Sequence, residues 1–463
     1  MKRFFRIVLL TITYVLVWCC VSDDIYATEV ENPIKICIDP GHGGENLGAE
    51  WLDYTEKDIT MQVAQAMKEE LEKYENIEVF LTRTTDVDMD LGERIDYAKS
   101  VDADFFFCLH FNMSVDHDIY GTENWISAFG KNYARGMDFA KIEMGLLTEL
   151  GLYDRGIKTK LNSKGTNYYG VLRLGDEAGI PGVIIEHCHL DNPNDEPFYD
   201  HSDWLDKYGK LDATAVAMYY GLYSPELGKD FRDYSYIPTE IPQSKVRPDT
   251  SEPEKADFEL GNITVDPVLD ENGNIIDYKA TAPIKVTGFD SDSRMLYYSV
   301  SFDGGNTFSE RYPWQGDSGD IDNTIENRIE LPFDRQLNVA VNVYNLFDLF
   351  TTSECKEYAS ISKPEIVIEE NINTSTIDKS NNEDLNYETI SHNEEFEFDV
   401  DAKNQAKDRL LSIKENSFLL ILVCVLAVAA LLVILIIVYF CIQFGKHNRR
   451  KKRRKRHKKI DKR

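Results

Sequence analysis

The sequence predicts an α/β fold, with a twisted and mostly parallel sheet flanked by helices, followed by an immunoglobulin-like β-sandwich and one transmembrane helix. Short apolar runs alternate with helical patterns in the first half of the chain, which is typical of strands and helices packed in layers. Period-two patterns with local turn signals come next, as in an all-β domain. An uncharged apolar stretch near the carboxyl end is long enough to span a bilayer.

The first predicted strand is Ile34–Ile38, an apolar run rich in β-branched residues. It ends at the turn Asp39–Gly44, where glycines allow the backbone to approach a ligand closely. His42 lies on this turn. Open α/β sheets hold their sites beyond the carboxyl ends of their strands, so His42 is a candidate site residue if partners follow other strands.

Such partners are present. Glu56 opens a pattern whose apolar residues recur at roughly helical spacing. The apolar runs Phe105–Leu109 and Val183–Ile185 end at His110 and Glu186. The other elements that we expect are a strand at Ile77–Leu81, helices at Leu91–Ser100, Tyr133–Leu150 and Trp204–Tyr220, and an extended stretch after Asp154-Arg155-Gly156 through Arg173.

Two histidines and one carboxylate form a ligand set of catalytic zinc that leaves a position for water. A second carboxylate is then free to act as a general base. Each residue also has a simpler interpretation on its own. His42 could be a surface histidine, His110 a hydrogen-bonded core histidine, Glu56 a helix cap, and Glu186 a buried ion-pair partner. The four together favour the metal site.

Six motifs surround these residues in order: Asp39-Pro40-Gly41-His42-Gly43-Gly44, Glu56-Lys57-Asp58, Leu109-His110-Phe111-Asn112, Asp154-Arg155-Gly156, Tyr169-Gly170-Val171-Leu172-Arg173, and Ile184-Ile185-Glu186 with Leu190 and Asn192. In them the chain resembles the zinc-dependent N-acetylmuramoyl-L-alanine amidases of the Amidase_3 type. The resemblance covers Pro33–Tyr223. It implies that His42, Glu56 and His110 bind Zn²⁺, that Glu186 is the catalytic carboxylate, and that peptidoglycan is the substrate.

The resemblance has one departure, because Cys188-His189 stand where the family usually has Gly-Phe. Cys188 could be a ligand or nucleophile, although packing beside Glu186 is favoured. Two residues are candidates for substrate binding. Arg173 could hold a peptide carboxylate, with a buried structural ion pair as the equal alternative. Asn112, in the motif that contains His110, is the other.

The two ends of the chain predict a membrane protein. Residues 1–27 have the layout of a secretory signal peptide, although an uncleaved anchor is the alternative. Residues 417–444 are predicted to form the transmembrane helix, and residues 445–463 a basic cytoplasmic tail. The tail carries a net charge of +12, and the rest of the chain −41. A tail beside a membrane span favours anionic lipids as partners over nucleic acid.

Between these ends we expect a catalytic domain at 33–224, a linker at 225–257, a β-sandwich at 258–358 and a disordered acidic linker at 359–416. The resemblance implies a bacterial peptidoglycan hydrolase, and the two ends of the sequence predict a single-pass protein of the cell membrane, of a Gram-positive bacterium, with the catalytic domain outside. It would cleave the amide bond between N-acetylmuramic acid and L-alanine. The alternatives are a catalytically silent peptidoglycan-binding protein and an adhesin-like surface protein.

Overall fold

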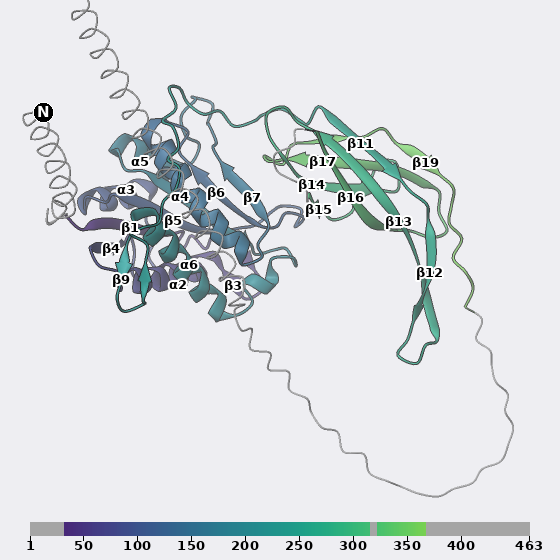
Figure 1. The fold of residues 1–463 in the computed structure, drawn as a ribbon, viewed down its shortest axis with the longest axis horizontal. Coiled ribbons are helices and arrows are strands. Elements are labelled where there is room, and N and C mark those ends of the chain that lie inside the picture. The colour runs from purple at the N-terminus through teal and green to yellow at the C-terminus, as the bar shows by residue number, and fades with distance from the viewer. Residues whose placement is uncertain (1–31, 315–321, 367–463) are drawn as a thin grey trace, which may run out of the picture. The chain divides into compact units, whose positions relative to one another are not determined.

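The computed structural model describes residues 32–314 and 322–366 (Figure 1). The predicted signal peptide, transmembrane helix and basic tail lie outside the described residues, as does the predicted acidic linker from residue 367 onward. Within the described ranges, no helix is both long enough and apolar enough to cross a membrane.

A six-stranded sheet forms the centre of the first domain. Four of the five pairs of neighbouring strands in this sheet are parallel, and one pair is antiparallel. The prediction of a mostly parallel sheet is therefore confirmed. The strands, in their order across the sheet, are β4 (Ile77–Leu81), β1 (Ile34–Pro40), β5 (Phe105–Asn112), β8 (Gly182–His189), β6 (Thr122–Ile126) and β7 (Asp154–Lys158).

Helices cover both faces of this sheet (Figure 1). In β5, Phe105 and Phe107 pack into one core and Phe106 into the other, because successive side chains of a strand point to opposite faces. The first core includes residues of α2 (Glu56–Leu71), α4 (Gly130–Glu149) and α6 (Ser202–Tyr220), and the second includes residues of α3 (Leu91–Ser100) and α5 (Gly170–Ala178). Short elements complete the domain: β2 (Glu50–Trp51), β3 (Tyr54–Thr55), η1 (Glu196–Phe198), β9 (Tyr223–Ser224) and β10 (Lys229–Asp230).

One segment differs from the prediction. The stretch through Arg173 is extended only in β7, and residues from Gly170 onward form α5. Val171, Leu172 and Gly175 are the buried residues of this helix, at spacings that place them on one face. The helix ends at Gly179, whose φ of 76° is the left-handed conformation that closes many helices.

The predicted linker at 225–257 is largely irregular, and part of it packs against the α/β domain. The ring of Tyr236 stacks on that of Tyr219, with 5.6 Å between their centroids. The main-chain N–H of Val246 donates to the carbonyl of Ala128 at 2.9 Å. These contacts fix the path of the chain between its two domains.

The second domain is an all-β domain with two antiparallel sheets around one apolar core. Its immunoglobulin-like assignment stays a prediction. One sheet contains β11 (Lys255–Leu260), β12 (Thr264–Leu269), β13 (Ile275–Phe289) and β16 (Asp322–Leu331). The other contains β14 (Met295–Ser301), β15 (Tyr312–Pro313), β17 (Leu337–Asn345), β18 (Phe350–Thr352) and β19 (Lys356–Tyr358).

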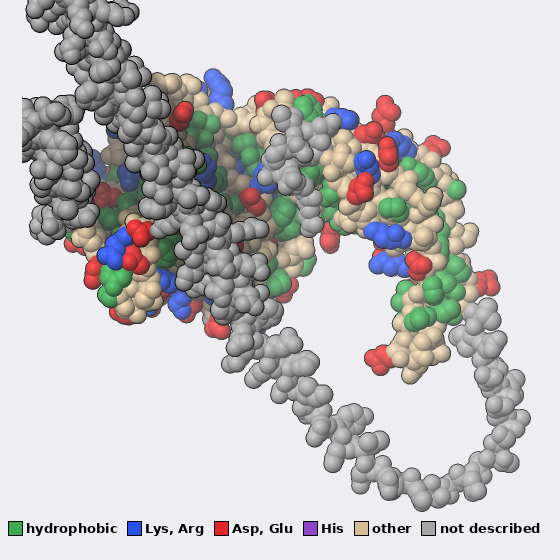
Figure 2. All heavy atoms as spheres, in the orientation of Figure 1, with side chains coloured by type: hydrophobic (Ala, Val, Ile, Leu, Met, Phe, Trp, Pro, Cys, Tyr) green, Lys and Arg blue, Asp and Glu red, His purple; other side chains and the backbone are tan. Residues whose placement is uncertain are grey.

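The hairpin of β12 and β13 carries exposed apolar side chains. Figure 2 shows hydrophobic side chains gathered on it. Leu269 and Ile276 are each more than half exposed. The hairpin turns at Asn272-Gly273, a residue pair that is common in tight hairpin turns, and Gly273 adopts a φ of 86°.

The α/β domain and the all-β domain belong to one compact unit and share buried contacts. The guanidinium of Arg155 in β7 donates to the carboxylate of Asp348 at 2.7 Å. Arg155 also donates to the hydroxyl of Tyr297 at 3.2 Å. Burial opposes ionisation of Asp348, but the positive charges of Arg155, Lys158 and Arg311 together outweigh it and lower the pKa of this carboxyl group.

Removing the charge of Asp348 should therefore destabilise the protein. Asp348→Asn keeps the side-chain shape and suits the left-handed φ of 61° at this position. We expect it to lower the free energy of unfolding by about 1–3 kcal/mol, because it removes the charge of one of the two carboxylates that pair with the buried Arg155. Since the pKa of Asp348 is lowered by folding, its contribution is fully present above the unfolded pKa of about 4 and is lost as the pH falls further.

Denaturant unfolding at pH 7 and at lower pH measures this contribution. The matched control is Asp230→Asn, which removes an exposed partner of Arg232 and should leave stability nearly unchanged. Equal effects of the two variants would contradict a buried interdomain ion pair.

Candidate active site

The predicted site residues come together at the carboxyl edge of the sheet, where β1, β5 and β8 are neighbours. His42 lies in the turn after β1. His110 and Glu186 lie near the ends of β5 and β8 and face each other in register. Glu56 is the first residue of α2. Parallel strands end at a common edge, so residues far apart in the sequence meet in one site.

Glu56 contacts both histidines. Its Oε2 lies 3.0 Å from Nε2 of His42, and its Oε1 lies 2.8 Å from Nδ1 of His110. The two imidazole rings are nearly perpendicular, with 4.9 Å between their centroids. Burial opposes ionisation of Glu56, but hydrogen bonds to His110 and His42 outweigh it and hold the pKa of this carboxyl group well below its usual value. The three side chains are close enough together to bind one metal ion.

Neighbouring groups fix the orientation of these side chains. Nδ1 of His42 lies 2.9 Å from Oδ1 of Asn46, which orients the ring so that Nε2 faces Glu56. The main-chain N–H groups of Ala49 and Phe111 donate to Oε2 and Oε1 of Glu56, at 2.8 and 3.0 Å. The carboxylate is thereby held by two main-chain donors in addition to the histidines.

Two glycines allow the side chains to approach the backbone this closely. A Cβ atom on Gly41 would lie 2.5 Å from Cε1 of His110. A Cβ atom on Gly48, whose φ is 75°, would lie 2.5 Å from Oε2 of Glu56. Both contacts are far shorter than van der Waals separations, so each position requires glycine.

Gly41→Ala should displace the imidazole of His110 and lower hydrolytic activity about 100-fold, because small displacements of catalytic groups have effects of this size. Gly145→Ala is the matched control. No atom lies within 4 Å of its added methyl group, so activity should be unchanged and stability equal or up to about 1 kcal/mol higher. Steady-state kinetics and thermal unfolding of both variants test this. Full activity in Gly41→Ala would contradict the close packing of His110.

Two buried arginines that the sequence analysis did not select hold the turn after β1. Nη2 of Arg94 donates to the carbonyl of His42 at 2.8 Å, and its Nη1 donates to the carboxylate of Asp39 at 2.7 Å. Nη2 of Arg83 donates to the carbonyl of Gly41 at 2.9 Å. A sequence signal was available for Arg83, since it follows the predicted strand Ile77–Leu81 and so belongs to the same edge of the sheet.

Glu186 lies beside this group and has an unpartnered oxygen. Its Oε2 is buried without a hydrogen-bond partner among the described residues. Burial, and then the negative charges of Glu56 and Glu123, raise the pKa of Glu186 well above its usual value. The unpartnered carboxylate oxygen next to the three candidate ligands is free to exchange a proton with a water molecule. The position therefore fits a general base.

Glu123 lies opposite Glu186 on the neighbouring strand β6. Its Oε2 accepts hydrogen bonds from Arg155 at 3.0 Å and from Lys158 at 2.6 Å. Its Oε1 accepts a hydrogen bond from Nδ2 of Asn112 at 3.2 Å. The predicted substrate-binding residue Asn112 is therefore held beside the site by a charged group that the sequence analysis missed. Its contact with substrate stays a prediction.

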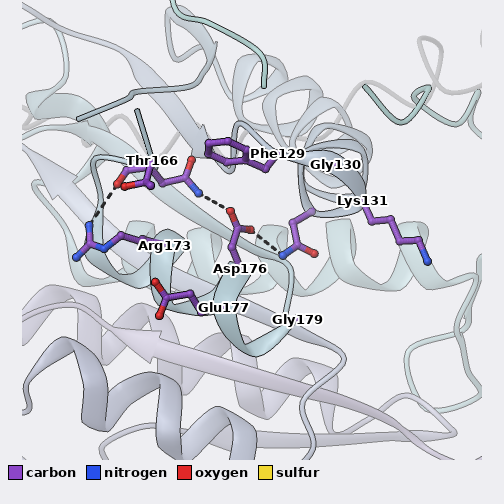
Figure 3. Close-up of a pocket in the computed structure, with 10 residues that line it drawn as sticks. Phe129, Gly130, Lys131, Thr166, Arg173, Asp176, Glu177 and Gly179 are labelled. Atoms are coloured by element: carbon purple, nitrogen blue, oxygen red, sulfur yellow. Dashed lines mark hydrogen bonds between the residues drawn. The ribbon is translucent and has the colours of Figure 1, made fainter. Parts of the chain in front are cut away.

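The other predicted substrate-binding residue, Arg173, lies in α5. Its Nη1 donates to the main-chain carbonyls of Asn167 and Tyr168, at 3.2 and 3.3 Å. It lines an open cavity of about 520 Å³ together with Asp176 and Glu177 (Figure 3). None of His42, Glu56, His110 and Glu186 lines this cavity. The structure thus does not group Arg173 with the metal-binding residues, and its role in substrate binding stays a prediction.

The residues that depart from the family pattern are buried. Cys188 packs in the apolar core, where burial raises the pKa of its thiol well above the usual value and disfavours the thiolate that a ligand or nucleophile needs. Nδ1–H of His189 donates to the carbonyl of Gly121 at 3.1 Å. Neither side chain is part of the metal-binding group.

The donor set fits zinc. Two imidazole nitrogens and a carboxylate are the protein ligands of many catalytic zinc sites, in which the fourth position is open. The unpartnered oxygen of Glu186 supplies a base beside them. His42, Glu56 and His110 would therefore hold the ion, and Glu186 would remain free for proton transfer.

Comparisons with known proteins identify relatives of the first domain. A protein-family model described as N-acetylmuramoyl-L-alanine amidase, Amidase_3, matches residues 36–218. The chain is 32% identical over 191 residues to the N-acetylmuramoyl-L-alanine amidase CwlM of Bacillus licheniformis. This alignment covers 41% of the present chain and 70% of CwlM. It is 40% identical over 205 residues to the N-acetylmuramoyl-L-alanine amidase AmiC of Escherichia coli, in an alignment that covers 36% of this chain and 48% of AmiC.

Among solved structures, an N-acetylmuramoyl-L-alanine amidase from Clostridium difficile is similar, with a TM-score of 0.37 and 26% identity. That match covers 41% of this chain and 98% of the other. The related proteins CwlM and AmiC are named as amidases, which favours an enzyme over the catalytically silent alternatives.

Proposed function

The chain belongs to the N-acetylmuramoyl-L-alanine amidase family, and we propose that it is a zinc-dependent enzyme held at the outer face of a bacterial cell membrane. Its activity is cleavage of the amide bond that joins N-acetylmuramic acid to L-alanine. The observation that carries the zinc proposal is the convergence of His42, Glu56 and His110 beside the unpartnered carboxylate oxygen of Glu186.

Zinc bound by these ligands would polarise the scissile carbonyl and lower the pKa of the attacking water. Glu186 accepts a proton from that water, whose oxygen forms a bond with the lactyl carbonyl carbon. The bond from this carbon to the nitrogen of L-alanine then breaks. Glu186 returns the proton to the departing amine, so each cycle leaves the carboxylate as it began.

The residues around Glu186 prepare it for this role. Arg155 and Lys158 neutralise Glu123, so the site is not left with an uncompensated charge across from Glu186. Asn112 is held by Glu123 and offers an oriented amide group to the substrate. Loss of hydrolysis on treatment of the purified protein with a chelator, and its return on addition of Zn²⁺, tests the metal requirement. Activity unchanged by complete metal removal would contradict it.

We place the enzyme at the membrane because of the two ends of the sequence. The signal-like residues 1–27 would direct export, the apolar residues 417–444 would anchor the chain, and the basic residues 445–463 would remain inside. The basic tail would also attract anionic lipid head groups, by about 1 kcal/mol for each Lys or Arg near the surface. The acidic exterior would be repelled by anionic wall polymers, so retention depends on the span.

Truncation after Lys414 should release an active enzyme into the culture medium, because it removes the span and the tail together. Immunoblotting of cells and medium, with the full chain as control, measures the distribution. Truncated protein that stays on cells through salt washing would show that another part of the chain, such as the all-β domain, retains it.

A further inference from the structure

A second group of potential metal ligands lies behind the active site. Glu143 in α4, His187 in β8 and Asp212 in α6 are fully buried, with ligand atoms within 4.8 Å of one another. His187 directly follows Glu186, so its side chain points to the opposite face of the sheet. There it packs among the helices of the first apolar core. The group is thus separate from the ligands His42, Glu56 and His110.

The hydrogen bonds of His187 leave one of its nitrogens facing a carboxylate. Its Nδ1 lies 3.1 Å from the main-chain carbonyl of His110, which can only accept, so Nδ1 carries a proton. Its Nε2 lies 3.1 Å from Oδ2 of Asp212. Phe111 and Tyr208 contact the ring, with centroid distances of 5.1 and 4.8 Å. With Nδ1 protonated, Nε2 either donates a second N–H to Asp212 or, as a neutral nitrogen, shares a cation with it.

The carboxylates of the group have oxygens without partners. Both oxygens of Glu143 and Oδ1 of Asp212 are buried and accept no hydrogen bond from any described residue. A single shared proton could join one oxygen of Glu143 to Asp212, but the other oxygen of Glu143 would remain unpartnered. A cation could bind these oxygens and Nε2 of His187 together. Buried unpartnered carboxylates are costly, which favours the arrangement that satisfies more of them.

We propose that Glu143, His187 and Asp212 bind a second divalent cation of the zinc class, which has a structural role. Two carboxylates would balance the charge of the ion in the buried interior. Complete burial of the ligands leaves no open position for substrate, which is the feature of structural sites. The ion would join α4, β8 and α6 and, through the hydrogen bond from His187, support the strand that carries His110.

The number of metal ions per chain tests this proposal. The purified full-length protein is saturated with Zn²⁺, dialysed against metal-free buffer and analysed by inductively coupled plasma mass spectrometry. We expect two ions per chain in the wild type, one in His110→Ala, one in Glu143→Gln and none in the double variant. The matched control is Glu70→Gln, a buried helix glutamate paired with Lys73 and Lys229, which should retain two.

The possible outcomes separate this site from the proposed catalytic one. One ion in the wild type that is lost in Glu143→Gln but kept in His110→Ala would support this inference and contradict the proposed catalytic zinc. One ion in the wild type that is kept in Glu143→Gln would overturn this inference and indicate that the buried group shares protons. If Glu143→Gln does not fold, His110→Ala decides the matter: one ion in that variant would support the inference, and none would overturn it.

Discussion

Replacing His110 with alanine should remove the catalytic metal and lower hydrolytic activity by more than about 100-fold. Glu56 would lose the nitrogen that lies 2.8 Å from its Oε1, and the metal would lose a ligand from a set of three. Changes in groups that merely support a metal ligand already cost about 10–100-fold, so loss of a ligand itself should cost more. Metal analysis and muropeptide hydrolysis, performed on the same preparation, measure both effects.

The matched control for this variant is His201→Ala, because the side chain of His201 is 76% exposed and outside the site. It should keep metal content and activity. If His110→Ala retained both full metal content and full activity, the assignment of the ligands would be wrong.

Glu186→Gln should separate metal binding from catalysis. Glutamine keeps the shape of the side chain but cannot accept the proton of the attacking water, so we expect activity to fall by at least about 100-fold. Metal content should remain close to that of the wild type, because Glu186 is not among the three ligands. Kinetics with soluble muropeptides, together with metal analysis, measure the two properties.

Glu177→Gln is the control, since Glu177 is exposed and lies in α5. Wild-type rates in Glu186→Gln would contradict its role as the base. If the cell-surface function of the protein were also unchanged in Glu186→Gln, the adhesin-like alternative would be favoured instead.

The sequence predicts the elements that carry the metal-binding residues because their signals are local. The strand that precedes His42 and the strand that contains His110 begin as apolar runs, and polar or turn residues follow these runs. Helix α3 has the predicted bounds, Leu91–Ser100, and a capping box formed by Asp90 and Glu93 marks its start.

The elements that the sequence analysis missed have weaker local signals. Strand β6 is fully buried yet contains Glu123 and Asn124, so it does not appear as an apolar run. Glu123 is tolerated there because Arg155 and Lys158 pair with it, and these partners lie 32 and 35 residues farther along the chain. The contact of Arg155 with Asp348 spans 193 residues. Ion pairs between residues so far apart in the sequence form only in the tertiary fold, so a short stretch of sequence cannot predict them.

The proposed reaction is tested most directly by mass spectrometry of purified peptidoglycan digested in H₂¹⁸O by the Zn²⁺-loaded full-length protein. The products should be peptides that begin with a free amino group on L-alanine, with ¹⁸O in the new lactyl carboxylate, because water attacks that carbonyl carbon. Both products should disappear in Glu186→Gln. Products cleaved at another bond, or the predicted products formed equally by Glu186→Gln, would contradict the account.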